Sequence, residues 1–152
     1  MLSTTWEIID MVADRLEEKS GPLGLAFVGK YDEKRIPKYP AAVIIPSGRD
    51  KELHATNTFQ LIIILDIYVY HSDLTLTKRE RSKADLRLVA DIEDELENDY
   101  EWRSSPADPN TKRLIFAYIS REEPGVLQPR ANKTNMVIGT RMTWRALTQR
   151  RF

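Results

Sequence analysis

Imidazole groups are the first place to look for chemistry in this chain, because they bind metal ions and transfer protons near neutral pH. The two histidines are His54 and His71, and with Asp73 beside the second they could contribute to a metal site if the intervening strand folded back. Cysteine is absent, and a zinc site needs three or four converging ligands. We therefore expect two exposed histidines at strand ends and no metal site.

Carboxylates offer a second reading. Glu17 and Glu18 precede Lys19, with Asp14 upstream, and some metal-dependent nucleases use such a set of carboxylates and a lysine. Here the set falls on an expected surface helix rather than at the end of a strand. We interpret it as a solvated helical face, and a small metal-dependent nuclease stays an alternative.

The glycine pattern predicts no phosphate-binding loop. Gly21, Gly24 and Gly29 are spaced too irregularly for a dinucleotide fingerprint, and no Gly-Lys-Ser or Gly-Lys-Thr follows a glycine-rich loop. The chain also lacks a recognisable nucleophile with its base or a metal cluster. We expect a protein with no enzyme activity and no cofactor.

The charges balance in number but not in position. With 23 Lys plus Arg and 23 Asp plus Glu, the whole chain has no general attraction for nucleic acid or anionic lipid. From Asp85 to Glu101 the acids are opposed only by Arg87, and from Pro124 to Phe152 there are basic residues and no acid. A sign asymmetry of this kind indicates a partner.

Length and composition predict one folded, soluble domain spanning residues 1–152. Hydrophobic residues make up 41% and charged residues 30%, close to globular averages, so the chain should bury a core. We find no cationic leader, and the longest apolar run, Leu61 to Leu65, is far short of the ~20 residues that span a membrane.

Two helices are predicted from capping boxes followed by apolar residues at intervals of three and four. Thr4 and Glu7 begin the first helix, which should end near Lys19 because Ser20-Gly21-Pro22 follows. Thr77 and Glu80 begin the second, which should run to about Asn98.

Strands are predicted from alternating apolar residues. They are expected at 23–31, 41–45, 56–70, 113–121 and 135–147, with turns at 47–50 and 124–125. In the last strand Met142 and Trp144 should share one face, with Arg141 and Arg145 on the other. The order of elements predicts an α+β fold, with a largely antiparallel mixed sheet packed against two main helices.

The strand from Thr56 to Tyr70 is much longer than the usual ~5–6 residues. Because one small sheet could not pair all its backbone groups, we expect it to project past the sheet and contact another subunit. The residues expected at this contact are Phe59, Ile62, Ile64, Tyr68 and Tyr70.

Charges on the second helix oppose its dipole, with bases at the N-terminal end and acids at the C-terminal end. We therefore expect the acids to face a basic surface of another chain, the candidates being Asp91, Glu93, Asp94 and Glu97. In the acid-free C-terminal region, the residues expected to form a surface for DNA or an acidic partner are Arg141, Arg145, Arg150 and Arg151.

The layout of the whole chain resembles the tail terminators and related neck proteins of long-tailed bacteriophages. The resemblance rests on the opening helix, the segment Tyr39-Pro40-Ala41-Ala42-Val43-Ile44-Ile45-Pro46, and the polar insertion after it. It continues in the long strand ending Asp66-Ile67-Tyr68-Val69-Tyr70, the covering helix and the closing pair of strands.

The resemblance implies a tail-terminator-like fold and a structural virion protein of the tail-neck region, assembled in the host cytoplasm. Such a protein forms a ring, usually a hexamer, that caps the tail tube and joins it to the head connector. The implied partners are copies of itself, the tail tube protein and the head connector or stopper protein, with DNA passing through. Another neck component, a head-closure or tail-completion protein, is the alternative within this class.

Overall fold

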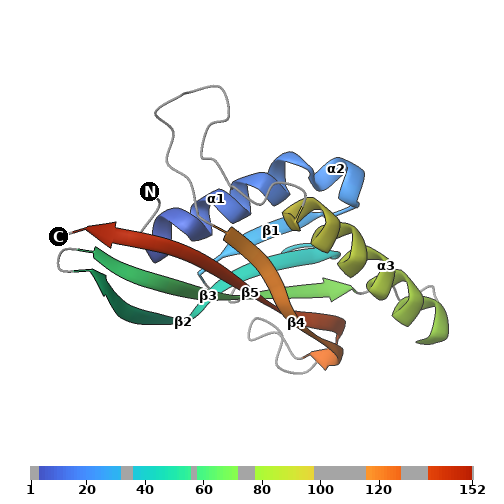
Figure 1. Cartoon of the computed structure of the whole chain (residues 1–152). Helices are drawn as coiled ribbons and strands as arrows, with labels where there is room; N and C mark the ends of the chain where they lie inside the picture. Colours follow the sequence, from blue (N-terminus) through green and yellow to red (C-terminus); the bar gives the residue numbers. More distant parts are fainter. Residues whose placement is uncertain are drawn as a thin grey trace.

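The computed structural model describes residues 4–31, 36–55, 58–71, 78–97, 116–127 and 137–151, which form an α+β fold of two layers (Figure 1). The elements are α1 (Thr5–Glu18), α2 (Ser20–Leu23), β1 (Phe27–Lys30), β2 (Ala41–Ala55), β3 (Thr58–His71), α3 (Lys78–Glu97), β4 (Phe116–Leu127) and β5 (Val137–Arg151). The strand order is β1-β2-β3-β5-β4. Since β1 and β2 are parallel and the other pairings are antiparallel, the predicted largely antiparallel mixed sheet is confirmed.

Both long helices lie on the same face of the sheet, with α1 packed on β1 and β2, and α3 packed on β3, β4 and β5. Thr4 is the N-cap of α1, and its hydroxyl donates a hydrogen bond to the Glu7 carboxylate, while its oxygen accepts no capping hydrogen bond from a backbone N–H. Asp10 then ties α1 to the end of β1, because it binds Lys30 Nζ at 2.9 Å and the Tyr31 hydroxyl at 2.7 Å. None of the helices in the described ranges is long and apolar enough to cross a membrane.

The predicted end of the first helix near Lys19 is confirmed, because α1 ends at Glu18 with Lys19 as its C-cap. The predicted left-handed stop at Ser20-Gly21-Pro22 is wrong, because these residues begin the short helix α2. Proline is tolerated in the first turn of a helix, where its missing N–H needs no partner. The left-handed residue that ends this helical region is Gly24, with φ of 76°.

Both predicted turns within the sheet are also wrong. β2 runs through residues 47–50, where a register shift between Pro46 and Gly48 bends the strand without ending it. β4 likewise continues through Pro124 and Gly125, and the proline is accommodated because β4 is an edge strand. Pairing with β3 and β5 outweighs the local turn preference at both places.

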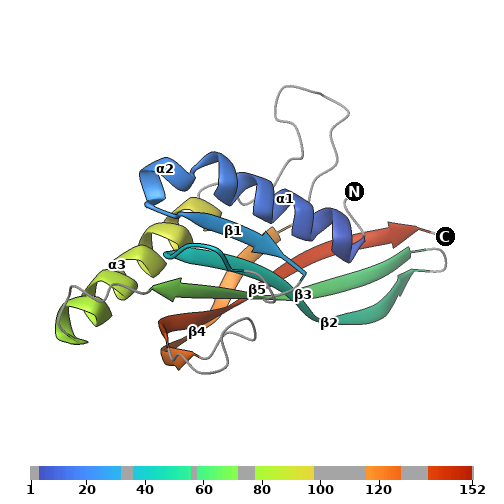
Figure 2. The same ribbon diagram turned by 180° about the vertical axis from the view of Figure 1, so that it is seen from behind.

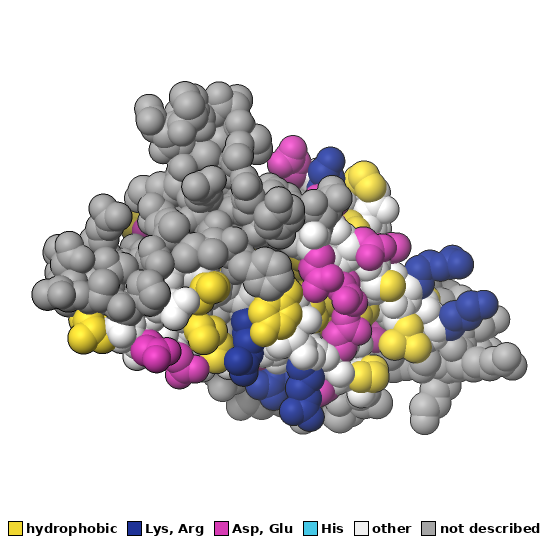
Figure 3. Space-filling model, in the orientation of Figure 1, with side chains coloured by type: hydrophobic (Ala, Val, Ile, Leu, Met, Phe, Trp, Pro, Cys, Tyr) yellow, Lys and Arg dark blue, Asp and Glu magenta, His cyan; other side chains and the backbone are white. Residues whose placement is uncertain are grey.

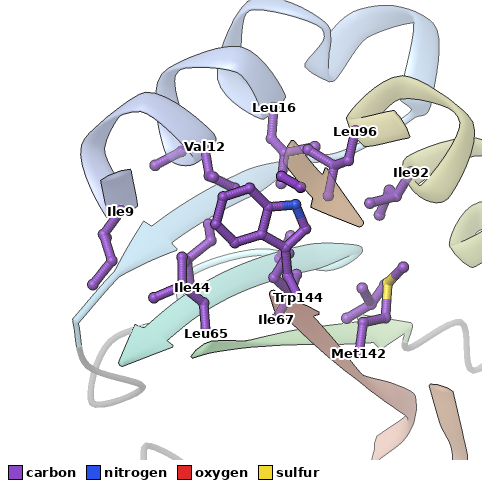
Figure 4. Packing of buried hydrophobic residues seen from close by; sticks show 14 of the residues in the cluster. Ile9, Val12, Leu16, Ile44, Leu65, Ile67, Ile92, Leu96, Met142 and Trp144 are labelled. Atoms are coloured by element: carbon purple, nitrogen blue, oxygen red, sulfur yellow. The ribbon is translucent and has the colours of Figure 1, made fainter. Parts of the chain in front are cut away.

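Trp144 lies at the centre of the core, fully buried between the helices and the sheet (Figure 4). The labelled side chains around it are Ile9, Val12, Leu16, Ile44, Leu65, Ile67, Ile92, Leu96 and Met142. The odd-numbered residues of β3 from Leu61 to Val69 belong to the helix side and are buried, as the alternation predicts. Burying a side chain as large as Trp144 stabilises the fold by several kcal/mol, roughly 3–5 by large-to-small substitution.

The sheet reaches beyond the helices at one end (Figures 1 and 2). β2, β3 and β5 are 15, 14 and 15 residues long, and their ends extend together past the first turn of α1. We call this extension the tongue; it comprises residues 49–55 of β2, 58–62 of β3 and 147–151 of β5. β3 lies in its middle.

The predicted reason for a subunit contact at the long strand is therefore wrong. β3 pairs with β2 from Thr58 to Tyr70 and with β5 from Thr58 to His71, so its backbone groups have partners in its own sheet. The neighbouring strands β2 and β5 are nearly as long as β3, so they supply hydrogen-bond partners for its backbone N–H and C=O groups along its length. Among the described residues, the strand edges without a neighbouring strand include β2 from Ile45 onward and the outer edge of β4.

Candidate functional site

One face of the sheet carries no helix within the described part of the chain, and we call it the open face. Its central residues come from β3 and β5 and alternate with those of the core. They are Ile62, Ile64, Asp66, Tyr68, Arg141, Thr143 and Arg145. This face combines partly buried apolar side chains with a row of charges.

Asp66 and Arg141 form an ion pair in the middle of the open face. Arg141 Nη2 donates to Asp66 Oδ2 at 3.1 Å, with 9% of the aspartate side chain and 41% of the arginine side chain exposed. The hydrogen bond and the charge of Asp66 raise the pKa of Arg141. Arg141 therefore neutralises a buried carboxylate of its own subunit.

Arg145 is placed differently from Arg141. It pairs in register with Ile64 on β3 and with Tyr118 on β4, whose side chain is 40% exposed. Among the described residues Arg141 has an ion-pair partner in Asp66 and Arg145 has none. Arg145 is therefore the better candidate of the two for binding a partner, whereas the side chains of Arg150 and Arg151 lie outside the described residues.

The residues predicted at the long-strand contact divide between the two faces. Ile62, Ile64 and Tyr68 are partly exposed on the open face. Phe59 lies on the opposite side, where Lys51 Nζ sits 3.9 Å from its ring centroid. Tyr70 is 1% exposed and packs with Val43 in a small cluster, so it supports the face from within.

The acids predicted on α3 lie on its outer side or beside β4. Asp91 and Asp94 are exposed, and Glu97 accepts a hydrogen bond from the backbone N–H of Ile119 at 2.9 Å. Glu93 is partly exposed near Glu122 of β4. Figure 3 shows acidic side chains gathered around α3 and β4, next to a separate group of basic ones.

Glu93 and Glu122 are a close pair of like charges. A hydrogen bond with Glu122 raises the pKa of Glu93 to about 7, and burial and the charges of Glu122 and Asp94 add to the effect. Two carboxylates held together share a proton because they cannot both ionise without repulsion. This end of the sheet would accommodate an added positive charge well.

The outer edge of β2 is a surface that the sequence pattern did not reveal. β1 covers β2 from Ala41 to Ile44, and from Ile45 to Ala55 the described ranges place β3 alone beside it. Residues 49–52 on this edge are all exposed and alternate in charge. The alternation of charge sign at a period of two is the signal for a strand here, whereas the predicted turn at 47–50 includes Arg49 and Asp50.

A pocket of about 440 Å³ lies between α2, the end of β3 and the start of α3. His71, Lys83, Arg87 and Asp91 contribute its polar lining. It does not gather a metal site, because the described residues include no group of three or more His, Cys, Asp or Glu suited to hold an ion. The other residues considered for a metal site, His54 and Asp73, lie outside the described side chains.

Close to this pocket, Asp85 joins α3 to the sheet. It is 2% exposed, and Thr140 Oγ1 on β5 donates to its Oδ2 at 2.8 Å. Burial raises the pKa of Asp85, while the Thr140 hydrogen bond and the charge of His71 lower it. We read Asp85 as a buried tether between α3 and the sheet.

The nuclease-like set on α1 remains at the surface. Asp14, Glu17, Glu18 and Lys19 are all exposed, and none of them lines the pocket. Comparison with protein-family models gives no match, and comparison with curated proteins gives no similar sequence.

Proposed function

We propose that this chain is a structural protein of a phage tail neck, a tail terminator that forms a ring, caps the tail tube and joins it to the head connector. Two observations support it: the resemblance in sequence layout, and a sheet whose long helices lie on one face. Its expected location is the virion, with assembly in the host cytoplasm.

The observation that carries the proposal is the one-sided architecture. Both long helices cover one face of the sheet, and within the described ranges no helix covers the open face and no strand other than β3 pairs with β2 from Ile45 onward. Exposed edge backbone and segregated charges are features through which protein subunits associate. Within a ring, a face that carries Arg145 could line a passage for DNA, where contact with phosphates is independent of sequence.

The proposal is tested by adding the purified protein to growing tail tubes. We expect a ring, usually of six subunits by native mass measurement, seated at one tube end in electron micrographs and stopping further growth. A protein that forms rings but binds only the head connector would indicate another neck component. A monomer that leaves tube growth unchanged would contradict the proposal, and cleavage of DNA with a divalent metal would favour the nuclease alternative.

A further inference from the structure

The free edge of β2 carries opposite charges on its two sides. Successive residues of a strand point to opposite faces. The register with β3 places Arg49 and Lys51 on the helix side and Asp50 and Glu52 on the open face. All four are exposed, and we call these residues, 49–52, the tongue edge.

The β4 edge of the sheet is acidic on its helix side and carries an arginine paired with a glutamate on its open face. On the helix side, Glu122 of β4 lies with Glu93 and Glu97 of α3. On the open face, the side chain of Arg121 is 72% exposed and Glu123 binds it at 2.7 Å. We call this group, Glu93, Glu97 and residues 121–122, the β4 end.

Each group lies beside a shallow hollow of about 250 Å³. The hollow at the tongue edge is lined by Asp50, Glu52 and Ile62, among others, so it offers carboxylates and an apolar floor to a basic side chain. The hollow at the β4 end includes Glu93 and Glu122, whose mutual repulsion a basic side chain would relieve. The hollow at the tongue edge would receive a basic side chain on the open face, and the hollow at the β4 end would receive one on the helix side.

We propose that the tongue edge of one copy docks beside the β4 end of a second copy, with the helix sides of both sheets facing the same way. In this arrangement the basic side of the tongue edge meets acids, and its acidic side meets Arg121. The contact is made by side chains rather than by a continuous sheet, because Glu97 already occupies the backbone N–H of Ile119 at the edge of β4.

A two-fold contact between two tongue edges is disfavoured by the same charges. Antiparallel pairing of β2 with itself would set Arg49 and Lys51 of both copies together on one face, and Asp50 and Glu52 together on the other. Like charges placed opposite one another in a sheet are destabilising. The contact is therefore head-to-tail, and repeated head-to-tail contacts close into a ring when their rotation allows it. This inference rests on the proposed function and adds the pair of surfaces that would build the ring.

Charge reversal tests the contact. Arg49→Glu with Lys51→Glu changes the tongue edge, and Glu93→Lys with Glu122→Lys changes the β4 end. Each pair should weaken self-association at least about tenfold at low salt, measured by sedimentation over a concentration series. All four changes in one chain should restore it to within about threefold, because the signs again match.

The control reverses two exposed acids on α1, Glu17→Lys with Glu18→Lys, and should leave association unchanged. A second measurement mixes the protein changed at the tongue edge with the protein changed at the β4 end. It does not need the chain with four substitutions, because a reversed tongue edge of one protein then meets a reversed β4 end of the other. Failure of both the fourfold chain and the mixture to regain assembly, with native circular dichroism throughout, would overturn the contact. If the protein forms rings and none of the charge reversals affects them, the proposed contact is overturned and the proposed function stands. If the chain is monomeric both alone and with tail tubes, the contact and the proposed function are both overturned.

Discussion

Replacing Arg141 by glutamine should destabilise the fold, whereas the same change at Arg145 should not. Both arginines lie on the open face and both were predicted to form a positive surface. Arg141 alone binds Asp66, at 3.1 Å, and its loss would leave a carboxylate with 9% of its side chain exposed without that cation. The first arginine has a structural role that the second lacks.

The magnitude follows from the exposure of the two partners. Removing one member of a fully buried pair costs about 3–5 kcal/mol, and an exposed pair contributes about 0–1 kcal/mol. Because Asp66 is buried and 41% of the Arg141 side chain is exposed, the free energy of unfolding should fall by about 1–2 kcal/mol. For a domain of this length, that loss lowers Tm by roughly 2–8 °C. Arg145→Gln should stay within about 0.5 kcal/mol of the unchanged protein.

Urea unfolding of four proteins measures the effect: the unchanged chain, Arg141→Gln, Asp66→Asn and the double variant. If the ion pair is the cause, the double variant should lose less than the sum of the single changes, by about 1 kcal/mol. Additive losses, or equal losses in Arg141→Gln and Arg145→Gln, would refute the assignment. DNA or partner binding by the two arginine variants can then be compared, since only the Arg145 change leaves stability intact.

Substitutions at Glu93, Asp85 and two glycines test the local chemistry. The pKa of Glu93 is raised from 4.5 to about 7, so its contribution to stability is present below pH 4.5 and is lost as pH rises toward 7. We measure the free energy of unfolding in urea at pH 5 and pH 8. Allowing for solvent screening, the decrease between these two pH values should be about 1 kcal/mol smaller in Glu93→Gln than in the unchanged protein. An unchanged protein with the same free energy of unfolding at both pH values would contradict this prediction. Asp85→Asn keeps an acceptor for Thr140 without a charge, and because burial raises the Asp85 pKa, it should unfold at the same or a higher temperature at pH 7. In Asp85→Ala the free energy of unfolding should fall by about 1–3 kcal/mol. Equal losses of stability in Asp85→Asn and Asp85→Ala would count against the role of Asp85 as a tether. Gly24→Ala should cost about 1–2 kcal/mol because φ is 76°, while Gly21→Ala in α2 should be neutral or stabilising by thermal unfolding; the reverse order would refute the backbone argument.

The periodicity of the chain determined the faces of its elements. Alternation placed Leu65 and Trp144 on the core side and Arg145 on the other, and helical spacing placed Ile92 against the sheet. These predictions succeed because burial of apolar area depends on the side-chain period, and that period is written locally in the sequence. The α+β class followed from the order of the elements for the same reason.

The tertiary structure alone decided where strands end and which charges meet. Residues 47–50 have the composition of a turn, yet they belong to β2 because β3 supplies pairing partners along its length. Asp66 and Arg141 are 75 positions apart, and the sequence pattern cannot bring them together before the register of β3 and β5 is known. The free edge of β2 is likewise a property of the assembled sheet, since it exists only because β1 is short. Pairing energy comes from distant parts of the chain, and a local preference of a few tenths of a kcal/mol yields to it.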